Sequence, residues 1–117
     1  VMKAKFFTLV FFIFFVGLGF AQEIKPKLEK QGDLIKATYY FDNGKVKEVG
    51  FFLDNKLHGE WITFNEEGKK TAVANYENGK KTGKWYVLAN GTVKELIYDS
   101  NKLVNVRNID STETSPI

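Results

Sequence analysis

Short runs of β-branched and aromatic residues alternate with polar turn sequences along residues 34–107. Asn-Gly between two such runs favours a tight hairpin, because a type I′ turn needs a positive φ at both central residues. Beyond the N-terminal segment, no window keeps apolar residues at i, i+3 and i+4, the helical pattern. The turn sequences are Asn43–Gly44, Asp54–Asn55, Glu67–Gly68, Asn78–Gly79, Asn90–Gly91 and Ser100–Asn101. The pattern predicts about seven antiparallel strands, near residues 34–41, 46–53, 59–65, 70–77, 83–88, 93–98 and 103–107.

The chain also repeats one phrase at a fixed distance. FLDNKLHGEW (Phe52–Trp61) returns 24 residues later as YENGKKTGKW (Tyr76–Trp85), and a weaker third copy begins at Tyr98. A short fixed period indicates one structural unit used several times. Each unit is too small to bury its own aromatic side chains, so neighbouring units must stack. The sequence therefore predicts an all-β array of antiparallel hairpins, an elongated β-meander of about two and a half to three repeats.

Two glycines and two tryptophans recur at fixed places in the repeat. Gly59 and Gly83 precede Trp61 and Trp85 by two residues. Either a Cβ at these glycines would collide with an aromatic ring, or the backbone there needs a positive φ. We expect the two tryptophans to stack in register, with a second ladder formed by Phe52, Tyr76 and Tyr98. The remaining structural glycines are those of the turns, Gly44, Gly68, Gly79 and Gly91.

The ends of the chain differ in composition from the repeats. Residues 22–33 read as a polar lead-in, and the repeat domain is expected over residues 34–107. In the last unit Asn105 stands at the Gly59/Gly83 position and no tryptophan follows, as expected of a capping repeat. Residues 108–117, NIDSTETSPI, are polar and lack a strand pattern, so we expect a disordered tail.

Residues 1–21 have the pattern of a secretory signal peptide. Lys3 and Lys5 precede an uncharged run of 16 residues, which ends in the small-residue triplet Gly19-Phe20-Ala21. The alternative, a permanent membrane anchor, would need about 20 apolar residues. We therefore expect cleavage near Ala21–Gln22 and a periplasmic or extracellular protein, which meets the membrane only through the transient signal peptide.

Charge and cysteine content exclude some classes of protein. The chain carries 17 basic and 14 acidic residues, and loss of residues 1–21 leaves 15 and 14. A nearly neutral domain lacks the basic excess of nucleic-acid binders, so that class is excluded. The chain has no cysteine, so neither disulfides nor lipid attachment to a cysteine is available.

The spacing Tyr-x-Asn-Gly-x-x-x-Gly-x-Trp of the second copy resembles the MORN repeat. More closely, the chain is similar to the MORN-like proteins of the bacterial YwqK-type antitoxin-like family, over roughly residues 37–106. Two departures are Asn55, where the motif has glycine, and the third copy without tryptophan. The resemblance implies an elongated, curved stack of hairpins and no known activity for most members.

The residues offer little for catalysis or for a cofactor. His58 is the only histidine and lies in a turn, so neither a site of several histidines nor the two-histidine motif of adenylyltransferases is available. A Ser-His-acid arrangement would depend on Ser100, also in a turn. Glu48, Glu60 and Glu95 lie on different strands, where solvated positions explain them as well as a catalytic pair does. We expect no catalytic residue, metal or cofactor, and a small enzyme is the remote alternative.

Two features are candidates for binding. Lys69, Lys70, Lys80, Lys81 and Lys84 cluster in the second repeat and can form a basic strip, although lysines also protect exposed strands from aggregation.

The second feature is the abundance of aromatic residues. Consecutive ones such as Tyr39 and Tyr40 point to opposite faces of a sheet, so one face can stay exposed unless the sheet curls or a homo-oligomer covers it. The sequence thus favours an exported binding module for a protein, glycan or envelope component. An antitoxin-like or envelope protein that occupies a partner enzyme is the alternative.

Overall fold

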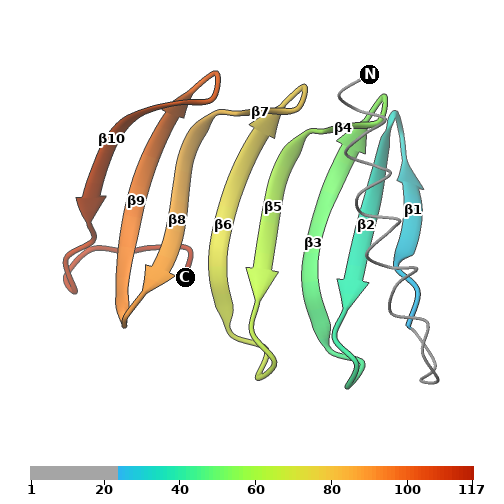
Figure 1. Cartoon of the computed structure of the whole chain (residues 1–117), viewed down its shortest axis with the longest axis horizontal. Helices are drawn as coiled ribbons and strands as arrows, with labels where there is room; N and C mark the ends of the chain where they lie inside the picture. The colour runs from blue at the N-terminus through green and yellow to red at the C-terminus, as the bar shows by residue number, and fades with distance from the viewer. Residues whose placement is uncertain (1–23) are drawn as a thin grey trace.

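A computed structural model describes residues 24–117, which form one antiparallel sheet without helices (Figure 1). The strands are β1 (Lys27–Gln31), β2 (Leu34–Tyr40), β3 (Val46–Leu53), β4 (Lys56–Leu57), β5 (Gly59–Phe64), β6 (Lys70–Glu77), β7 (Lys80–Lys81), β8 (Gly83–Ala89), β9 (Thr92–Asp99) and β10 (Lys102–Asn108). Their order across the sheet is β1-β2-β3-β5-β6-β8-β9-β10. The all-β hairpin array is thus confirmed, with ten strands in place of about seven.

Two of the three additional strands, β4 and β7, are short pieces that follow a hairpin turn. β4 pairs back onto β3, and the chain then steps across to pair as β5 with β6. β7 and β8 repeat this step between β6 and β9. As a result, β3 pairs with β5 at only two positions, and so does β6 with β8. A two-residue strand is too short to show a period in the sequence, which is why it was missed.

The step from one strand partner to the next takes place at Gly59 and Gly83. Their φ angles are +83° and +66°, in the region that favours glycine. A Cβ there would touch nothing closer than 4.0 Å, so the backbone conformation and not crowding requires glycine. The glycine that lies beneath a ring is Gly50, where a Cβ would overlap the Trp61 indole. The sequence analysis missed Gly50 because it lies outside the repeated phrase.

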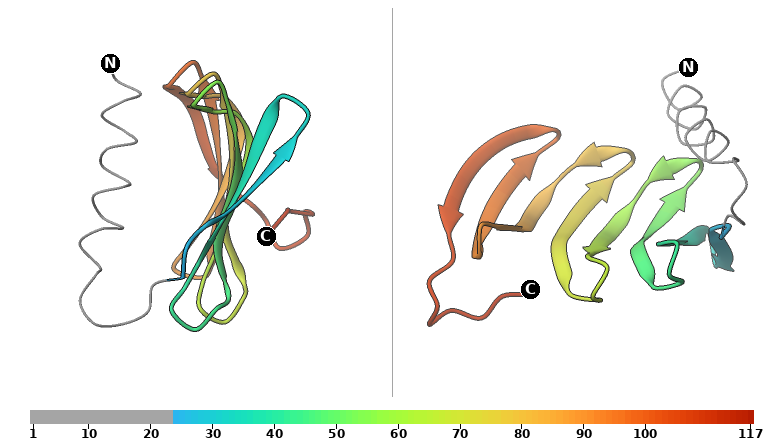
Figure 2. Two further views of the ribbon diagram at one scale, coloured as in Figure 1. Left: turned by 90° about the vertical axis from the view of Figure 1, so that its right-hand side faces the viewer. Right: turned by 60° about the horizontal axis from the view of Figure 1, so that its bottom comes forward.

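Cross-strand pairing assigns every strand residue to one of two faces. Directly paired residues share a face, and neighbours along a strand alternate. The pairs Trp61↔Ala74 and Trp85↔Leu96 define what we call the aromatic face. The pair Tyr86↔Glu95 lies on the opposite side, which we call the tail face because the C-terminal segment folds against it (Figure 2).

The sheet is a single layer, as its edge-on view shows (Figure 2). Within residues 24–117 only Ala37, Phe52, Val73 and Ala74 are buried hydrophobic residues, and no large side chain is below 2% exposure. A conventional core between two layers is therefore absent from this part of the chain. Apolar burial must come from side chains that lie over the sheet and against one another.

The sheet extends beyond the predicted repeat domain at its N-terminal edge. The polar lead-in 22–33 contains β1, which pairs with β2 along its whole length, from Lys27↔Thr38 to Gln31↔Leu34. The turn between them places Gly32 at φ +63°. Backbone pairing with an existing strand needs no apolar side chains, so a polar sequence can still form an edge strand.

The C-terminal segment, predicted to be disordered, makes defined contacts instead. Ile109 donates its backbone N–H to the carbonyl of Val93 at 2.8 Å. Asp110 then accepts from the backbone N–H of Thr112, and Glu113 forms two hydrogen bonds with Arg107. Polar composition indicated disorder, but these polar groups find partners on the sheet and within a turn.

The predicted signal peptide, residues 1–21, lies outside the described residues. Within the described part of the chain, no helix has the length and hydropathy needed to cross a membrane.

We predict that Gly50→Ala destabilises the protein by about 1–3 kcal/mol, because overpacking forces the Trp61 ring to move. The free energy of unfolding should be measured for Gly50→Ala, Trp61→Phe and the double variant. The two changes should be non-additive, since the smaller ring leaves room for the added methyl group. Strictly additive losses would contradict the contact.

Candidate functional site

Six aromatic rings lie across the aromatic face and form what we call the aromatic band: Tyr39, Phe52, Trp61, Tyr76, Trp85 and Tyr98. Trp61 has its ring centroid 6.3 Å from Tyr39 and 5.5 Å from Phe52. Trp85 lies 5.2 Å from Tyr76 and 5.0 Å from Tyr98. These separations are those of favourable aromatic pairs. The predicted rings thus share one face, but the two expected ladders do not form among the described residues. Each tryptophan instead packs against rings of the other predicted ladder, and Tyr39 joins the Trp61 cluster.

Both indole N–H groups are used inside the protein. Trp61 Nε1 donates to the carbonyl of Phe51 at 3.1 Å. Trp85 Nε1 donates to the carbonyl of Asn75 at 2.9 Å and lies 3.2 Å from that of Thr82. Each indole thus bonds to the neighbouring strand of the sheet, Trp61 on β5 to β3 and Trp85 on β8 to β6. It spans a repeat junction at which only two pairs of residues join the two strands. The band can consequently offer a ligand ring surfaces but no indole donor.

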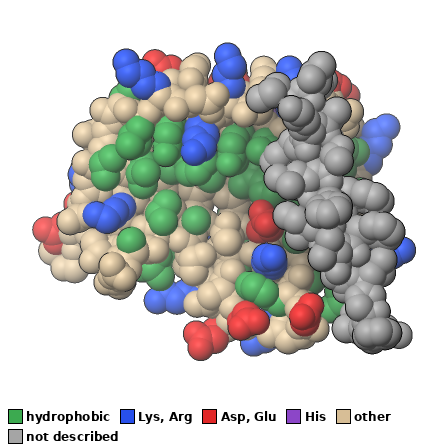
Figure 3. Space-filling view, in the orientation of Figure 1, with side chains coloured by type: hydrophobic (Ala, Val, Ile, Leu, Met, Phe, Trp, Pro, Cys, Tyr) green, Lys and Arg blue, Asp and Glu red, His purple; other side chains and the backbone are tan. Residues whose placement is uncertain are grey.

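One cation lies within the aromatic band. The ammonium of Lys81 is 5.3 Å from the ring centroid of Trp85 and 5.1 Å from that of Tyr98. Distances below about 6 Å are favourable for cation–π interaction. Figure 3, which views the aromatic face, shows hydrophobic side chains running across the strands with a basic side chain among them. Five rings of the band are half-buried, and Phe52 is buried.

Glu48 lies beside the band on the same face, opposite Tyr39 and Thr63. Burial raises the pKa of the Glu48 carboxyl, and the nearby Lys47 opposes the shift. Burial, and then the charge of Glu48, also raise the pKa of the Tyr39 and Tyr76 hydroxyls. Glu48 is thus a half-buried acid whose ionised form is disfavoured.

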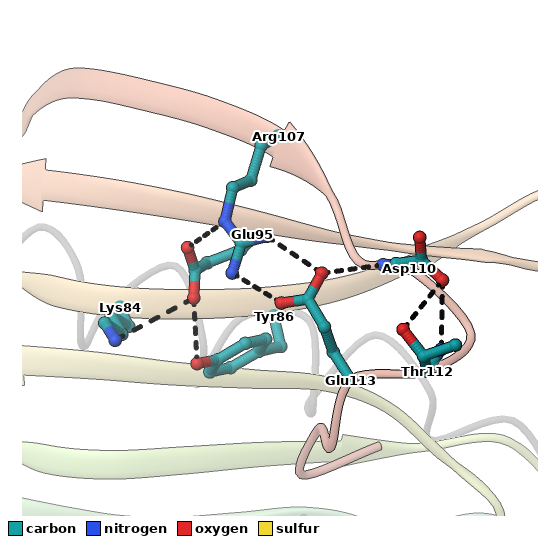
Figure 4. Close-up of polar contacts among 7 residues, drawn as sticks. All are labelled: Lys84, Tyr86, Glu95, Arg107, Asp110, Thr112 and Glu113. Atoms are coloured by element: carbon teal, nitrogen blue, oxygen red, sulfur yellow. Dashed lines mark hydrogen bonds and ion pairs between the residues drawn. The ribbon is translucent and has the colours of Figure 1, made fainter.

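The tail face carries a polar cluster centred on Glu95, which is 4% exposed (Figure 4). Its carboxylate accepts hydrogen bonds from Arg107 Nε at 2.9 Å and from the Tyr86 hydroxyl at 3.0 Å, and it lies 4.0 Å from the Lys84 ammonium. Arg107 also holds Glu113 in the tail. The hydrogen bonds from Arg107 lower the pKa of Glu95 and of Glu113. All these polar atoms are paired, so the cluster fastens the tail to the sheet.

The predicted lysine strip does not form. Lys69 and Lys70 lie at the start of β6, whereas Lys80 and Lys81 follow its far end, roughly 23 Å away at 3.3 Å per residue. Lys84 points to the tail face, where it approaches Glu95. Only Lys81 joins the aromatic band. These lysines are close in sequence, but the full length of β6 separates Lys69 and Lys70 from Lys80 and Lys81.

The residues weighed for catalysis are dispersed. His58 Nδ1 accepts the backbone N–H of Asn78 at 3.2 Å and so links two neighbouring hairpins. Ser100 lies in the turn between β9 and β10, a further hairpin away. Glu48 is on the aromatic face, whereas Glu60 and Glu95 are on the tail face. These groups do not converge on one site.

Among residues 24–117 no group of three or more His, Asp or Glu side chains is arranged to hold a metal ion. Searches against protein-family models, curated proteins and solved structures gave no match to this chain. Its function must therefore be argued from the two faces themselves. The tail face is occupied by a self-paired cluster, and the aromatic face presents half-exposed rings with one cation.

Sequence reasoning missed the Arg107–Glu95 contact because a β-bulge in β10 turns the side chains that follow it to the opposite face of the sheet. Arg107 stands at the repeat position of Trp61 and Trp85, which point to the aromatic face. The register shift between Leu103 and Asn105 places it opposite Glu95 instead. The sequence feature that could have indicated this change is Asn105, which stands where the other repeats have glycine.

We predict that Glu48→Gln raises the melting temperature at pH 7. The folded-state pKa of Glu48 is raised, so its protonated form stabilises the fold and that contribution is lost as pH rises through the folded pKa. Gln removes the charge, and the gain should shrink towards zero below about pH 4, where Glu48 is protonated. Thermal unfolding against pH tests this, with Glu60→Gln on the other face as control. An equal gain in melting temperature at pH 7 and below about pH 4 would contradict this account of Glu48.

We predict that Arg107→Met lowers the melting temperature at pH 7 and releases the tail. The lowered pKa values of Glu95 and Glu113 mean that their stabilisation is present above the ordinary pKa of Glu, about 4.3, and is lost as pH falls through the folded values. The difference from wild type should therefore narrow in acid.

The matched control for Arg107→Met is Lys102→Met on the same strand. Lys102 makes no ion pair within the described residues. The Lys102→Met variant should have the melting temperature of the wild type, and its tail amides should stay protected from hydrogen exchange. A tail that remains protected in Arg107→Met would refute the fastening role of the cluster.

Proposed function

We propose that this chain is an exported, non-enzymatic repeat protein of the MORN-like type that binds an extended glycan of the cell envelope along its aromatic band. The observation that supports the proposal is a row of six rings on one face of a single-layer sheet. The tail, in contrast, folds on the opposite face (Figure 2). Half-exposed aromatic surface of this extent is typical of a binding site.

The dimensions of the band suit a linear ligand. It crosses six adjacent strands from β2 to β9, a span of about 24 Å at 4.8 Å per strand. Trp61 and Trp85 lie on β5 and β8, two strand spacings or about 10 Å apart. That separation is close to the disaccharide repeat of an extended glycan, so alternate sugar rings can meet the two indoles.

A glycan fits the band better than an extended peptide does. Inside the sheet, backbone N–H and C=O groups pair with neighbouring strands, and both indole N–H groups are bonded internally. A peptide laid over the rings would leave its own backbone groups unpaired, which costs free energy. A pyranose presents its apolar C–H face to an aromatic ring while its hydroxyls point sideways into water.

The predicted signal peptide supports an envelope location, where such glycans occur. The resemblance of the repeated phrase to MORN repeats supports an elongated binding surface. Neither argument names the glycan, so the first experiment compares ligand lengths.

The test is isothermal titration of the naturally processed protein with neutral β-linked oligosaccharides, cellohexaose and chitohexaose, and with the corresponding disaccharides. The hexasaccharides should bind more tightly, since they reach both Trp61 and Trp85. Absence of binding by every oligosaccharide, or equal affinity for the short and long forms, would overturn the proposal.

We predict that Tyr39→Leu weakens hexasaccharide binding by about 5- to 50-fold, equivalent to 1–2.3 kcal/mol. Leu keeps an apolar side chain against Trp61 but removes the ring at the end of the band. Phe51→Leu is the matched control, because Phe51 pairs with Lys36 in a regular stretch of β3 and points to the tail face. It should bind like wild type, and equal effects of the two changes would exclude the aromatic face as the site.

A further inference from the structure

Lys81 is an exception within the repeat. The equivalent residues of the neighbouring units are Leu57 and Leu103, which likewise pair with the aromatic residues Phe52 and Tyr98. Lys81 pairs with Tyr76 in the same way. An apolar residue therefore satisfies the fold at this position twice, and only the middle unit carries a charge there.

The Lys81 backbone is held by Asn101 through two hydrogen bonds. Its N–H donates to Asn101 Oδ1 at 2.8 Å, and its carbonyl accepts the N–H of Asn101 at 2.9 Å. The side chain then lies over Trp85 and Tyr98. In this position Lys81 is half-buried, whereas the adjacent Lys80 is exposed.

Within the described residues, the Lys81 ammonium has no carboxylate partner within 4.0 Å, and its contacts are with the two rings. Lys84 and Arg107, by contrast, both approach Glu95 on the other face. A half-buried cation without a carboxylate partner in the described residues favours an anion from outside, because the surrounding apolar rings reduce screening by water.

From this we infer that Lys81 is an anion-recognition residue and that the glycan bound by the aromatic band is acidic, with a carboxylate or phosphate at the sugar that stacks on Trp85. The inference rests on the proposed function. An acidic sugar carries its charge at the rim of the ring, so its C–H face can lie on the indole while the anion reaches the ammonium.

The other charged groups on the aromatic face are consistent with this placement. Lys94, on the same face, is hydrogen-bonded to Asn108 at 3.1 Å, whereas the Lys81 ammonium lies over two rings. Glu48 lies on the same face next to Tyr39, towards the other end of the band.

The experiment uses two probes that share a backbone: hexagalacturonate and its fully methyl-esterified form. Isothermal titration of the naturally processed wild-type protein should show at least ten-fold tighter binding of the acid form, a preference that salt weakens. Lys81→Leu, which restores the residue of the neighbouring repeats, should lose the preference and bind both probes alike. Lys80→Leu, which removes the adjacent exposed charge, should keep the preference.

The outcomes separate this inference from the proposed function. Equal binding of acid and ester by the wild type, or a preference that survives in Lys81→Leu, overturns the role of Lys81 and leaves glycan binding intact. Failure of both probes and of the neutral hexasaccharides overturns the proposed function itself. Poly-L-glutamate bound as tightly as hexagalacturonate would overturn the assignment to a glycan. Unchanged circular dichroism in Lys81→Leu confirms that folding is not the cause of a lost preference.

Discussion

The contact between each tryptophan and the hairpin before it holds this sheet together. Where one repeat meets the next, β3 pairs with β5, and β6 with β8, at only two positions. At the first junction Trp61 lies over Gly50 and bonds to the Phe51 carbonyl, and at the second Trp85 bonds to the Asn75 carbonyl. The indole supplies both a hydrogen bond and apolar contact at the place where the backbone ladder is weakest. In the last unit Arg107 stands at this position and points to the tail face, where it bonds to Glu95.

A single-layer sheet makes this contact serve a second purpose. Side chains that would face another layer in a sandwich face water here, and the rings are buried mainly by one another. The rings that stabilise the repeat junctions are therefore also the surface at which we propose that a ligand binds. Because the indole N–H groups are already bonded, the proposed recognition depends on ring surfaces and on the cation at Lys81. Stability and binding are consequently coupled at the tryptophans and separable at Tyr39 and Lys81.

The main features of the fold could be predicted because each follows from local sequence. The turn residues and the alternating pattern located seven strands, and the repeated phrase located the rings and the corner glycines. The positions that depend on pairing between strands could not be read in this way. Gly50 meets Trp61 only after β3 and β5 align, and Arg107 reaches Glu95 only because a bulge shifts β10 by one residue. The predicted lysine strip was wrong for the same reason, because β6 separates Lys69 and Lys70 from Lys80 and Lys81 in space although they are close in sequence.

The polar ends show where composition misleads. β1 and the tail lack apolar periodicity, yet backbone pairing orders the first and charge-assisted hydrogen bonds order the second. The tail also decides which face remains for a ligand, because it folds on the side of Glu95 and Arg107 (Figures 2 and 4). The tail thus occupies one face of the sheet, and the proposed binding surface lies on the other.

The measurement that tests this division most directly is a nuclear magnetic resonance titration of the isotopically labelled protein with a hexasaccharide. The two indole N–H signals, from Trp61 and Trp85, report on the aromatic face, and the backbone amides of Tyr86, Glu95 and Arg107 report on the tail face. We expect the indole signals and the amides around the aromatic band to shift with ligand while those of the tail face stay in place. Shifts confined to the tail face or to the edge strands β1 and β10 would contradict the account.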